Sequence, residues 1–497
     1  MSDDKPKAPA TPIAKVATAA PAAKPTAGAK SGAVAKRPAA KKADLFGDAG
    51  LSSVEIDPLP TPRHTRGFAG VASEHLGLVL MPMSLALLAV LRPLVDSGKG
   101  AVIAMFLGVA CAAVVTALAG SALVRYGLLP GVWVRPMLGP LGAKAFTLLR
   151  ALVIATFLGH AAWLAAQSLR WGALCAWPQL APLDAKIPSV GGESLVLVAL
   201  TLILFAVAVA RPLTKWVFVP GALLAVLLAF VPGAASLHLL TAGEGLQGLF
   251  EPWSIAFMWA VCLFAIALPS ARQVRSSAVH AGGVLAATVI PWTAAAAVYA
   301  LATFRGSPLS RFADLTELAC ARLPLPFLIP ETLLVAVACL LPLAAPTVLA
   351  VRTSVSEVLP RVAQTSRTAR FIGHGFLALG VILALVARSA SGAPFMTAQL
   401  LLAVLAAAFV VVATADFYLV RRGRIFLDDL YSRTGIYRGV FGISPAGVSA
   451  MLVGAAVEFT LKMHGELGAV AFMFSLAAWT VAQVVLGNLE RWVRERK

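Results

Sequence analysis

Few residues in this sequence have the types and spacing that enzymatic chemistry requires. There is no Gly-Xaa₄-Gly-Lys-Ser/Thr phosphate loop and no Gly-Xaa-Ser-Xaa-Gly turn, so ATP-driven pumping and serine hydrolysis have no support. The cysteines form no Cys-Xaa-Xaa-Cys pair and no Cys/His cluster, which predicts neither a metal site nor a disulfide framework. They are Cys111, Cys175, Cys262, Cys320 and Cys339. We therefore expect no enzyme and no cofactor.

Two carboxylates lie inside apolar stretches, where an acidic residue is a functional candidate. They are Glu331 and Glu458. Both lie close to the ends of their apolar stretches. A structural role, with the carboxylate reaching the membrane interface, is therefore an equal alternative.

The composition indicates that lipid surrounds most of the chain. Of 497 residues, 59% are hydrophobic and 13% are charged, whereas soluble domains are about a quarter charged. The mean hydropathy is +0.85. This predicts an all-α polytopic membrane protein with about 12 transmembrane helices. We place them near 76–94, 101–124, 145–169, 194–210, 216–236, 253–271, 280–304, 324–350, 371–387, 398–420, 441–461 and 468–486.

The chain divides into three predicted regions. Residues 1–70 are rich in Ala, Pro and Lys and cannot bury enough apolar surface to fold, which predicts a disordered basic tail without a signal peptide. Such a tail either touches anionic lipid, nucleic acid or another partner, or is simply solvated. Residues 71–490 form the transmembrane domain and residues 491–497 a short cytoplasmic C-terminus.

Positive charge predicts the orientation. Loops on the tail's side of the predicted spans carry far more Lys and Arg than the loops on the other side. Because positively charged loops stay in the cytoplasm, both termini are predicted to be cytoplasmic. The stretch "ADFYLVRRGRIFLDDLYSRTGIYR", residues 415–438, is one such loop. We expect Arg421, Arg422 and Arg424 to contact anionic headgroups there, with Asp428 and Asp429 answering them within the loop.

Two stretches resemble the nucleobase–cation symporter family, which includes the cytosine, purine, allantoin and hydantoin permeases. Residues 120–169 are similar to its second-to-third helix region, and residues 415–454 to its loop between helices ten and eleven. The matching positions of the first stretch are Arg125, Gly127, Leu129-Pro130, Arg135, Leu138-Gly139, Gly142-Ala143 and Arg150. In the second they are "LVRRG", "DLY" and a Gly-Xaa-Tyr.

The resemblance implies a LeuT-like fold: two inverted five-helix repeats plus two C-terminal helices, with substrate held near mid-membrane between broken helices one and six. In helix one, Pro82 removes a backbone hydrogen bond and Ser84 lies beside it, giving either a break or a simple kink. In helix six the family Asp is replaced by Ser270, Pro269 is present, and no Gly explains an unwound segment.

The resemblance also implies the site residues. Phe157 matches an aromatic that stacks on a flat heterocycle, and Ala161 occupies the position of an amide. His160 is either a ligand or a packing residue, and Trp259 supplies a second aromatic wall. Thr347 is expected to contact both substrate and cation. The expected cation site comprises Pro82, Ser84, Thr347, Thr353 and Ser354.

The predicted function is cation-coupled uptake of a nucleobase or related small nitrogen heterocycle by alternating access. The coupling ion would be Na⁺ or H⁺, the partners a small-molecule substrate and the lipid bilayer, and the location the inner membrane of a bacterium. An alternative is a sensor or scaffold on the same fold that binds a partner through its basic tail, because several polar site residues of the family are replaced here. An amino-acid permease is disfavoured because its loops would differ.

Overall fold

The computed structural model describes residues 64–85, 87–91, 94–95, 98–190, 193–210, 212, 216–229, 248–303, 325–359, 366–389, 393–431, 435–463 and 468–495. The chain divides at Asp44 into two units, and all described residues belong to the second, Leu45–Lys497. The predicted tail, residues 1–70, lies almost wholly outside the described residues. The structure therefore does not test the partners predicted for it.

Helices account for nearly all of the regular structure. In the first part of the chain they are α1 (Phe68–Leu80), α2 (Pro82–Leu85), α3 (Leu87–Leu91), α4 (Gly98–Tyr126), α5 (Pro130–Trp133), α6 (Arg135–Ala176), η4 (Pro178–Leu180), α7 (Ala181–Asp184), α8 (Leu195–Ala210) and α9 (Val219–Ala229). The remainder are α11 (Phe250–Ala265), α12 (Leu268–Ala271), α13 (Ser277–Thr303), α15 (Leu325–Val358), α16 (Ser366–Ser389), α17 (Ala393–Ala415), the π-helix η6 (Asp416–Val420), α18 (Leu427–Tyr431), α19 (Pro445–Met463) and α20 (Ala469–Glu495). The strands β1 (Ser189–Val190) and β2 (Glu193–Ser194) pair antiparallel, with Ser189 opposite Ser194.

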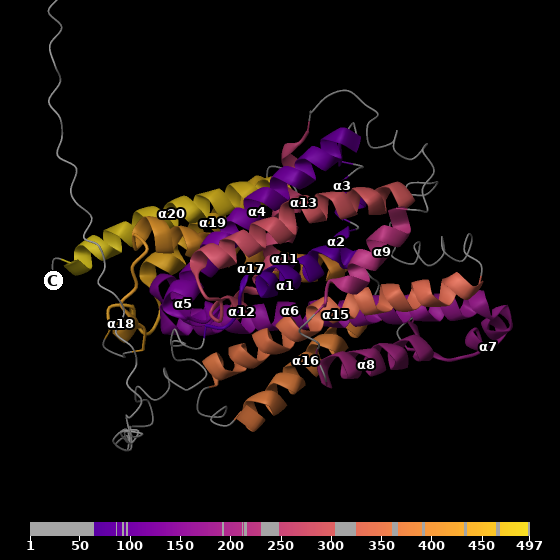
Figure 1. The fold of residues 1–497 in the computed structure, drawn as a ribbon. Coiled ribbons are helices and arrows are strands. Elements are labelled where there is room, and N and C mark those ends of the chain that lie inside the picture. The colour runs from indigo at the N-terminus through magenta and orange to yellow at the C-terminus, as the bar shows by residue number, and fades with distance from the viewer. Residues whose placement is uncertain are drawn as a thin grey trace, which may run out of the picture. The chain divides into compact units, whose positions relative to one another are not determined.

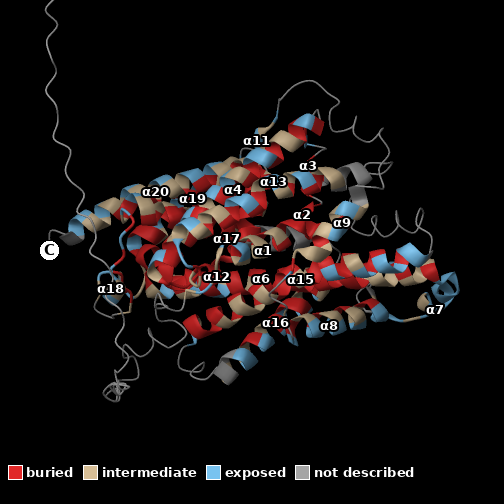
Figure 2. Ribbon diagram, in the orientation of Figure 1, coloured by how far each residue is buried: buried red, intermediate tan, exposed pale blue. Residues whose placement is uncertain are grey.

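The long helices pack in two groups (Figure 1). In the α4 group, α11 and α13 pack along α4, and α1 packs on α13. In the α6 group, α15, α16 and α8 pack along α6. Helices α19 and α20 form a pair of their own. Figure 2 shows that buried residues concentrate on α6 and α15. Along α8 and α16, buried and exposed residues alternate.

Close approach within these groups depends on small residues. A Cβ on Gly108 of α4 would lie 2.7 Å from Cβ of Ala256 in α11. A Cβ on Gly159 of α6 would lie 2.9 Å from Cβ of Ala384 in α16. Small residues at helix crossings let backbones approach in lipid, where apolar burial drives little association. Large apolar side chains on the outer faces, such as Ile290 at 74% exposure, are then available to lipid.

A break interrupts the first span between α1 and α2. Met81 has extended dihedrals, φ −70° and ψ 147°. Pro82 has no N–H, so the Leu78 carbonyl loses its normal helical donor. The hydroxyl of Ser84 takes that place and donates to the Leu78 carbonyl at 2.8 Å. Of the two alternatives for Pro82, the structure shows a break.

A second interruption separates α11 from α12. Ile266 and Ala267 keep right-handed dihedrals, and their N–H groups bond three residues back, to the carbonyls of Leu263 and Phe264. Pro269 follows directly, and its missing N–H leaves the Ala265 carbonyl without a helical donor. The interruption is therefore a tightened turn next to a proline and needs no glycine, which resolves the difficulty seen in the sequence.

The predicted spans are only partly tested. Five helices are long and apolar enough to cross a membrane, and six shorter apolar helices accompany them among the described residues. The number twelve therefore stays a prediction. Several helices exceed their predicted bounds: α6 begins at Arg135 and α15 continues to Val358. The cysteine prediction is wrong in one respect, because Cys175 near the end of α6 is disulfide-bonded. Cys111, Cys262 and Cys339 are free.

Candidate substrate and cation site

The two predicted aromatic walls meet between the helix groups. The rings of Phe157, on α6, and Trp259, on α11, have centroids 5.8 Å apart and are tilted by 58°. Phe157 is buried, and the indole N–H of Trp259 is buried without a hydrogen-bond partner in the part of the chain that the structure describes. An unpaired buried donor is costly unless something outside the chain accepts its hydrogen bond. The pair therefore offers two stacking faces and one available donor.

The spacing of this pair defines how a ligand could enter. A flat ring held between two others needs centroids about 7–8 Å apart, twice the contact distance of 3.5–4.0 Å. The rings of Phe157 and Trp259 are closer than this and touch each other. A heterocycle must therefore separate them or stack on an outer face. Because the two rings come from different helix groups, a relative shift of the groups would change their spacing.

The neighbouring candidates on α6 have different surroundings. His160 stacks on Trp163 at 5.9 Å with an angle of 19° between the rings. Ala161 is 1% exposed and presents only a methyl group at the amide position. Gly159 faces α16. The structure thus pairs His160 with an aromatic partner on its own helix, and Phe157 across to α11.

The predicted cation ligands fall into two kinds. Thr347 and Ser354 on α15 are buried, and their hydroxyls have no hydrogen-bond partner within the described ranges. Thr353 already donates to the Ala350 carbonyl at 2.9 Å, and Ser84 donates to Leu78. Thr347 and Ser354 are separated by about 10 Å along the helix axis, since each residue adds 1.5 Å. One cation with oxygen ligands at about 2.5 Å cannot contact both.

The α1–α2 break supplies further oxygen atoms. The Ser84 carbonyl accepts a hydrogen bond from the indole of Trp292 on α13 at 2.9 Å. The would-be Cβ of Gly77 lies 3.4 Å from Cβ of Pro342, so α1 near its break packs directly against α15. Thr347 lies five residues further along that helix. Of the two open hydroxyls, Thr347 is the one nearer to this contact in sequence, and it is the better candidate.

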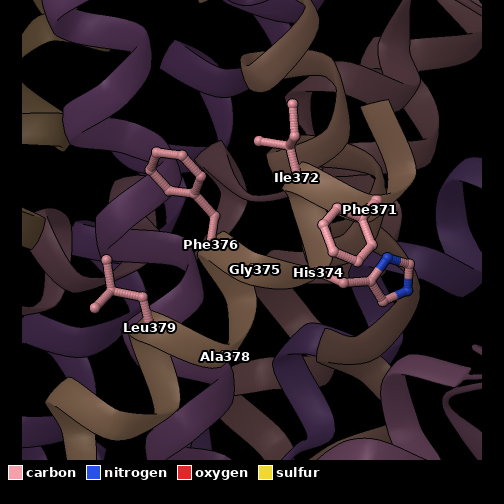
Figure 3. A pocket seen from close by; sticks show the side chains of 7 residues that line it. All are labelled: Phe371, Ile372, His374, Gly375, Phe376, Ala378 and Leu379. Carbon is pink, nitrogen blue, oxygen red and sulfur yellow. The ribbon is translucent and has the colours of Figure 1, made fainter. Parts of the chain in front are cut away.

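A cavity of about 540 Å³ lies elsewhere, along α16 (Figure 3). Its lining residues are Phe371, Ile372, His374, Gly375, Phe376, Ala378 and Leu379. All come from one helix, and Phe371 is 80% exposed. A hollow lined by one face of one helix is open to the surroundings, so we assign no substrate role to it.

The sequence reasoning missed a buried charged cluster at the other end of α15. Glu357 accepts a hydrogen bond from Thr147 at 3.0 Å, while its Oε1 has no hydrogen-bond partner among the residues that the structure describes. The Arg150 guanidinium is 1% exposed and makes no hydrogen bond with any described residue. Glu357 lies beyond the predicted span 324–350, so the predicted spans do not include it. The buried carboxylates of α15 are Glu331 and Glu357 among the described residues.

The two stretches that suggested the family contact each other. Tyr126 donates to the Gly423 carbonyl at 2.9 Å, and Arg135 to the Leu430 carbonyl at 2.8 Å. At Gly139, where φ is +76°, α6 has a kink, and the next N–H beyond Pro140, that of Leu141, donates to the Gly442 carbonyl at 2.8 Å. A Cβ on Gly139 would lie 2.6 Å from that carbonyl oxygen, so glycine is required there.

One prediction about this loop is wrong. Arg421 does not reach outward to headgroups: it pairs with Asp416 and donates to the Pro136 carbonyl. Arg422 and Arg424 are exposed, so headgroup contact by these two stays a prediction.

The chain is similar in sequence to one family and in fold to several solved structures. The sequence model of a family described as permeases for cytosine/purines, uracil, thiamine and allantoin matches residues 97–482. A direct sequence search of curated proteins finds no match to this chain. Among solved structures, the fold is similar to Mhp1, a nucleobase-cation-symport-1 family transporter, closed with bromovinylhydantoin bound: TM-score 0.66, 19% identity, covering 90% of this chain and 96% of that one.

Two further structures support the fold. The inward-facing conformation of Mhp1 gives a TM-score of 0.68 at 19% identity, over 90% of this chain and 95% of that chain. A Na⁺-coupled sialic acid symporter gives 0.51 at 10% identity, over 86% and 90%. The fold is therefore the LeuT-like fold expected from the sequence. The chain is a multi-pass membrane permease, not an enzyme, and it belongs to the family of permeases for cytosine/purines, uracil, thiamine and allantoin.

Proposed function

We propose that the protein is a secondary active transporter that takes up a nucleobase or a related small nitrogen heterocycle, coupled to Na⁺ or H⁺. The observation that carries this proposal concerns two polar atoms in the bundle interior, the Trp259 N–H and the Thr347 hydroxyl, which have no hydrogen-bond partner among the described residues. Inside a membrane such groups are costly, and a polar ligand or an ion would satisfy them. The family membership supports the same function.

The substrate is held, in this proposal, against the rings of Phe157 and Trp259. A nucleobase or hydantoin ring has carbonyl oxygens that accept from an indole N–H, and a face that stacks on an aromatic ring. His160 completes the substrate contacts, and the small Ala161 leaves room for the ring. The cation would bind at the α1–α2 break between backbone carbonyls near Pro82 and Ser84 and the Thr347 hydroxyl. Thr353 and Ser354 would line the path from that site toward the cytoplasm.

The test begins with binding and continues with transport. Purified protein is screened by thermal shift against uracil, cytosine, hypoxanthine, allantoin and hydantoin, with and without Na⁺, because a ligand of the folded state raises the melting temperature with its concentration. Any hit is then tested for uptake into liposomes under Na⁺ and H⁺ gradients. Silence in both assays would contradict the proposal.

A matched pair of tryptophan variants locates the site. Trp259→Phe removes an unpartnered buried N–H from the proposed site, and Trp479→Phe removes another from α20. Trp259→Phe should weaken ligand binding about tenfold, as expected for one lost hydrogen bond of about 1.5 kcal/mol. Trp479→Phe should leave binding unchanged. Equal effects of both would place the substrate elsewhere.

The location in a bacterial inner membrane with cytoplasmic termini is part of the proposal. The disulfide at Cys175 supports the orientation, because α6 would then end on the outer, oxidising side of the membrane. The positive charge of the loops favours the same orientation.

A further inference from the structure

Two histidines meet inside the α4 group, away from the substrate site. His75 on α1 and His280 on α13 have ring centroids 6.1 Å apart, at 73° to each other. Their exposed fractions are 1% and 2%. A polar ionisable pair that is fully buried between membrane helices is unusual and points to a function.

The hydrogen bonds fix the state of His75. Its Nδ1 lies 3.0 Å from the Val71 carbonyl oxygen, which only accepts, so Nδ1 carries the hydrogen. In the neutral ring Nε2 then has a free lone pair, and this atom has no hydrogen-bond partner among the described residues. His280 lies beside the Thr116 carbonyl, and within the described part of the chain neither of its ring nitrogens makes a hydrogen bond of ordinary geometry. His75 Nε2 and the His280 nitrogen that does not face Thr116 are therefore open.

The packing holds the two rings in place. The ring of Phe264 on α11 lies 6.0 Å from that of His75. A Cβ on Gly120 of α4 would lie 1.8 Å from Nε2 of His280, so that ring fits only because position 120 has no side chain. The site is thus enclosed by α1, α4, α11 and α13 together.

The charged groups that face this pair, within the described residues, are Arg66 and Glu74. Glu74 is 12% exposed on its side chain, pairs with Arg66 at 2.8 Å and accepts from Ser270 at 2.7 Å. It interacts electrostatically with His280. Glu74 therefore connects the buried pair with the partly exposed end of α1, and α4 and α11 present only uncharged groups such as Thr116 and Phe264.

We propose that His75 and His280 form a proton-binding site that is taken up and emptied during the transport cycle. A hard cation such as Na⁺ prefers oxygen ligands, which the two rings lack. The described residues place no third metal-binding side chain beside the two rings, whereas protein sites for metals such as zinc use three or four. A proton binds to one lone pair, that of His75 Nε2, and places a positive charge beside the His280 ring, whose centroid lies 6.1 Å from that of His75.

The consequence is mechanical as well as chemical. In the protonated pair the positive charge at His75 changes the contact between α1 and α13, and release of the proton to water through Glu74 reverses that change. Because α1 leads directly into the break at Met81, its tilt affects the proposed substrate site. Assigning this proton as the coupling ion rests on the proposed transport function, whereas binding of the proton does not.

The first test needs no substrate. Full-length protein labelled with ¹⁵N-histidine in lipid nanodiscs is titrated between pH 4 and 9, and the ring signals are assigned with His75→Gln and His280→Gln. We expect the two rings to titrate as a coupled pair, so that removing either changes the proton affinity of the other at least tenfold. His374→Gln is the control, because that exposed ring contacts the carbonyl four residues earlier on α16, as His75 does on α1.

Two results would overturn the site. Both rings could stay neutral over the whole pH range, or they could titrate independently of each other. The titration of the wild-type protein alone shows whether the two rings stay neutral. The proton site can therefore be refuted even when a variant fails to fold.

The second test asks whether the proton is the coupling ion. For a transported substrate, an inward proton gradient should accelerate uptake by the wild type and by His374→Gln, but not by His75→Gln or His280→Gln. Substrate binding by thermal shift should be unchanged in all four. Proton-driven uptake that persists in both histidine variants would refute the coupling role. Absence of any uptake would refute the proposed transport function instead. The existence of the proton site would then be decided by the histidine titration alone.

Discussion

Arg421 and Asp416 form a nearly buried ion pair at the end of η6. The Arg421 Nε lies 3.2 Å from Oδ2 of Asp416, and the two side chains are 9% and 4% exposed. The same guanidinium donates to the Pro136 carbonyl at 2.8 Å, and the other Asp416 oxygen accepts from Gln483 of α20 at 2.8 Å. The ion pair and its hydrogen bonds therefore join η6 to the first turn of α6 and to the last helix, α20.

Arg421→Gln should destabilise the protein strongly. The substitution leaves the Asp416 carboxylate buried without its cation, which typically costs about 3–5 kcal/mol. Thermal unfolding in detergent or nanodiscs measures the loss. Arg422→Gln is the matched control, because Arg422 is exposed on the same turn and should change stability by less than about 0.5 kcal/mol. Equal melting temperatures for both variants would show that the pair contributes nothing.

The contacts of Arg421 could not be predicted from the sequence. Its position after an apolar stretch predicts headgroup contact equally well for Arg421, Arg422 and Arg424. What separates them is Pro136, 285 residues away, and no local pattern reports that contact. The same holds for His75 and His280, which are far apart in the chain and become a pair only through helix packing.

Other features could be predicted from local covalent chemistry. Pro82 removes one helical donor, and the break appears at the residue before it, as proline sterics require. Pro269 gives the same signal for the second interruption, although glycine was the expected cause. Helix type and fold class follow from apolar run lengths. The ends of the helices do not follow from apolar run lengths, because Glu357 and Arg135 are buried by partners outside their own helices.

Gly120→Ala should disturb the packing of α4 against α13. A methyl group there would overlap His280 Nε2, so the ring must move, and such overpacking typically costs about 1–3 kcal/mol. The proton titration of His75 should change as well, because its partner ring is displaced. Gly375→Ala is the control, since nothing lies within 4 Å of a Cβ at that position on α16. The ¹⁵N-histidine spectra of both variants check this, and an unchanged His280 signal in Gly120→Ala would contradict it.

Trp292→Phe should destabilise the backbone conformation at the α1–α2 break. The indole N–H of Trp292 is the donor to the Ser84 carbonyl at 2.9 Å, and Trp292 is fully buried. Loss of the donor leaves that carbonyl unsatisfied, at a cost of about 1–3 kcal/mol. Trp171→Phe is the control, because Trp171 is 40% exposed on α6. We expect a lower melting temperature and weaker cation binding only in Trp292→Phe. Cation binding at wild-type affinity would mean that the break does not contribute to the cation site.

Reduction of the disulfide at Cys175 should lower stability and reveal the orientation of the chain. Cys111, Cys262 and Cys339 are free, so none of these three is the partner of Cys175. A disulfide typically stabilises a protein by about 2–4 kcal/mol, so Cys175→Ser should melt earlier than wild type, and the free-thiol control Cys111→Ser should not. Peptide mapping without reductant identifies the partner directly. In intact spheroplasts, a membrane-impermeant reductant followed by a thiol-reactive reagent should label Cys175. Labelling only after the membrane is opened would place this end of α6 in the cytoplasm and reverse the proposed orientation.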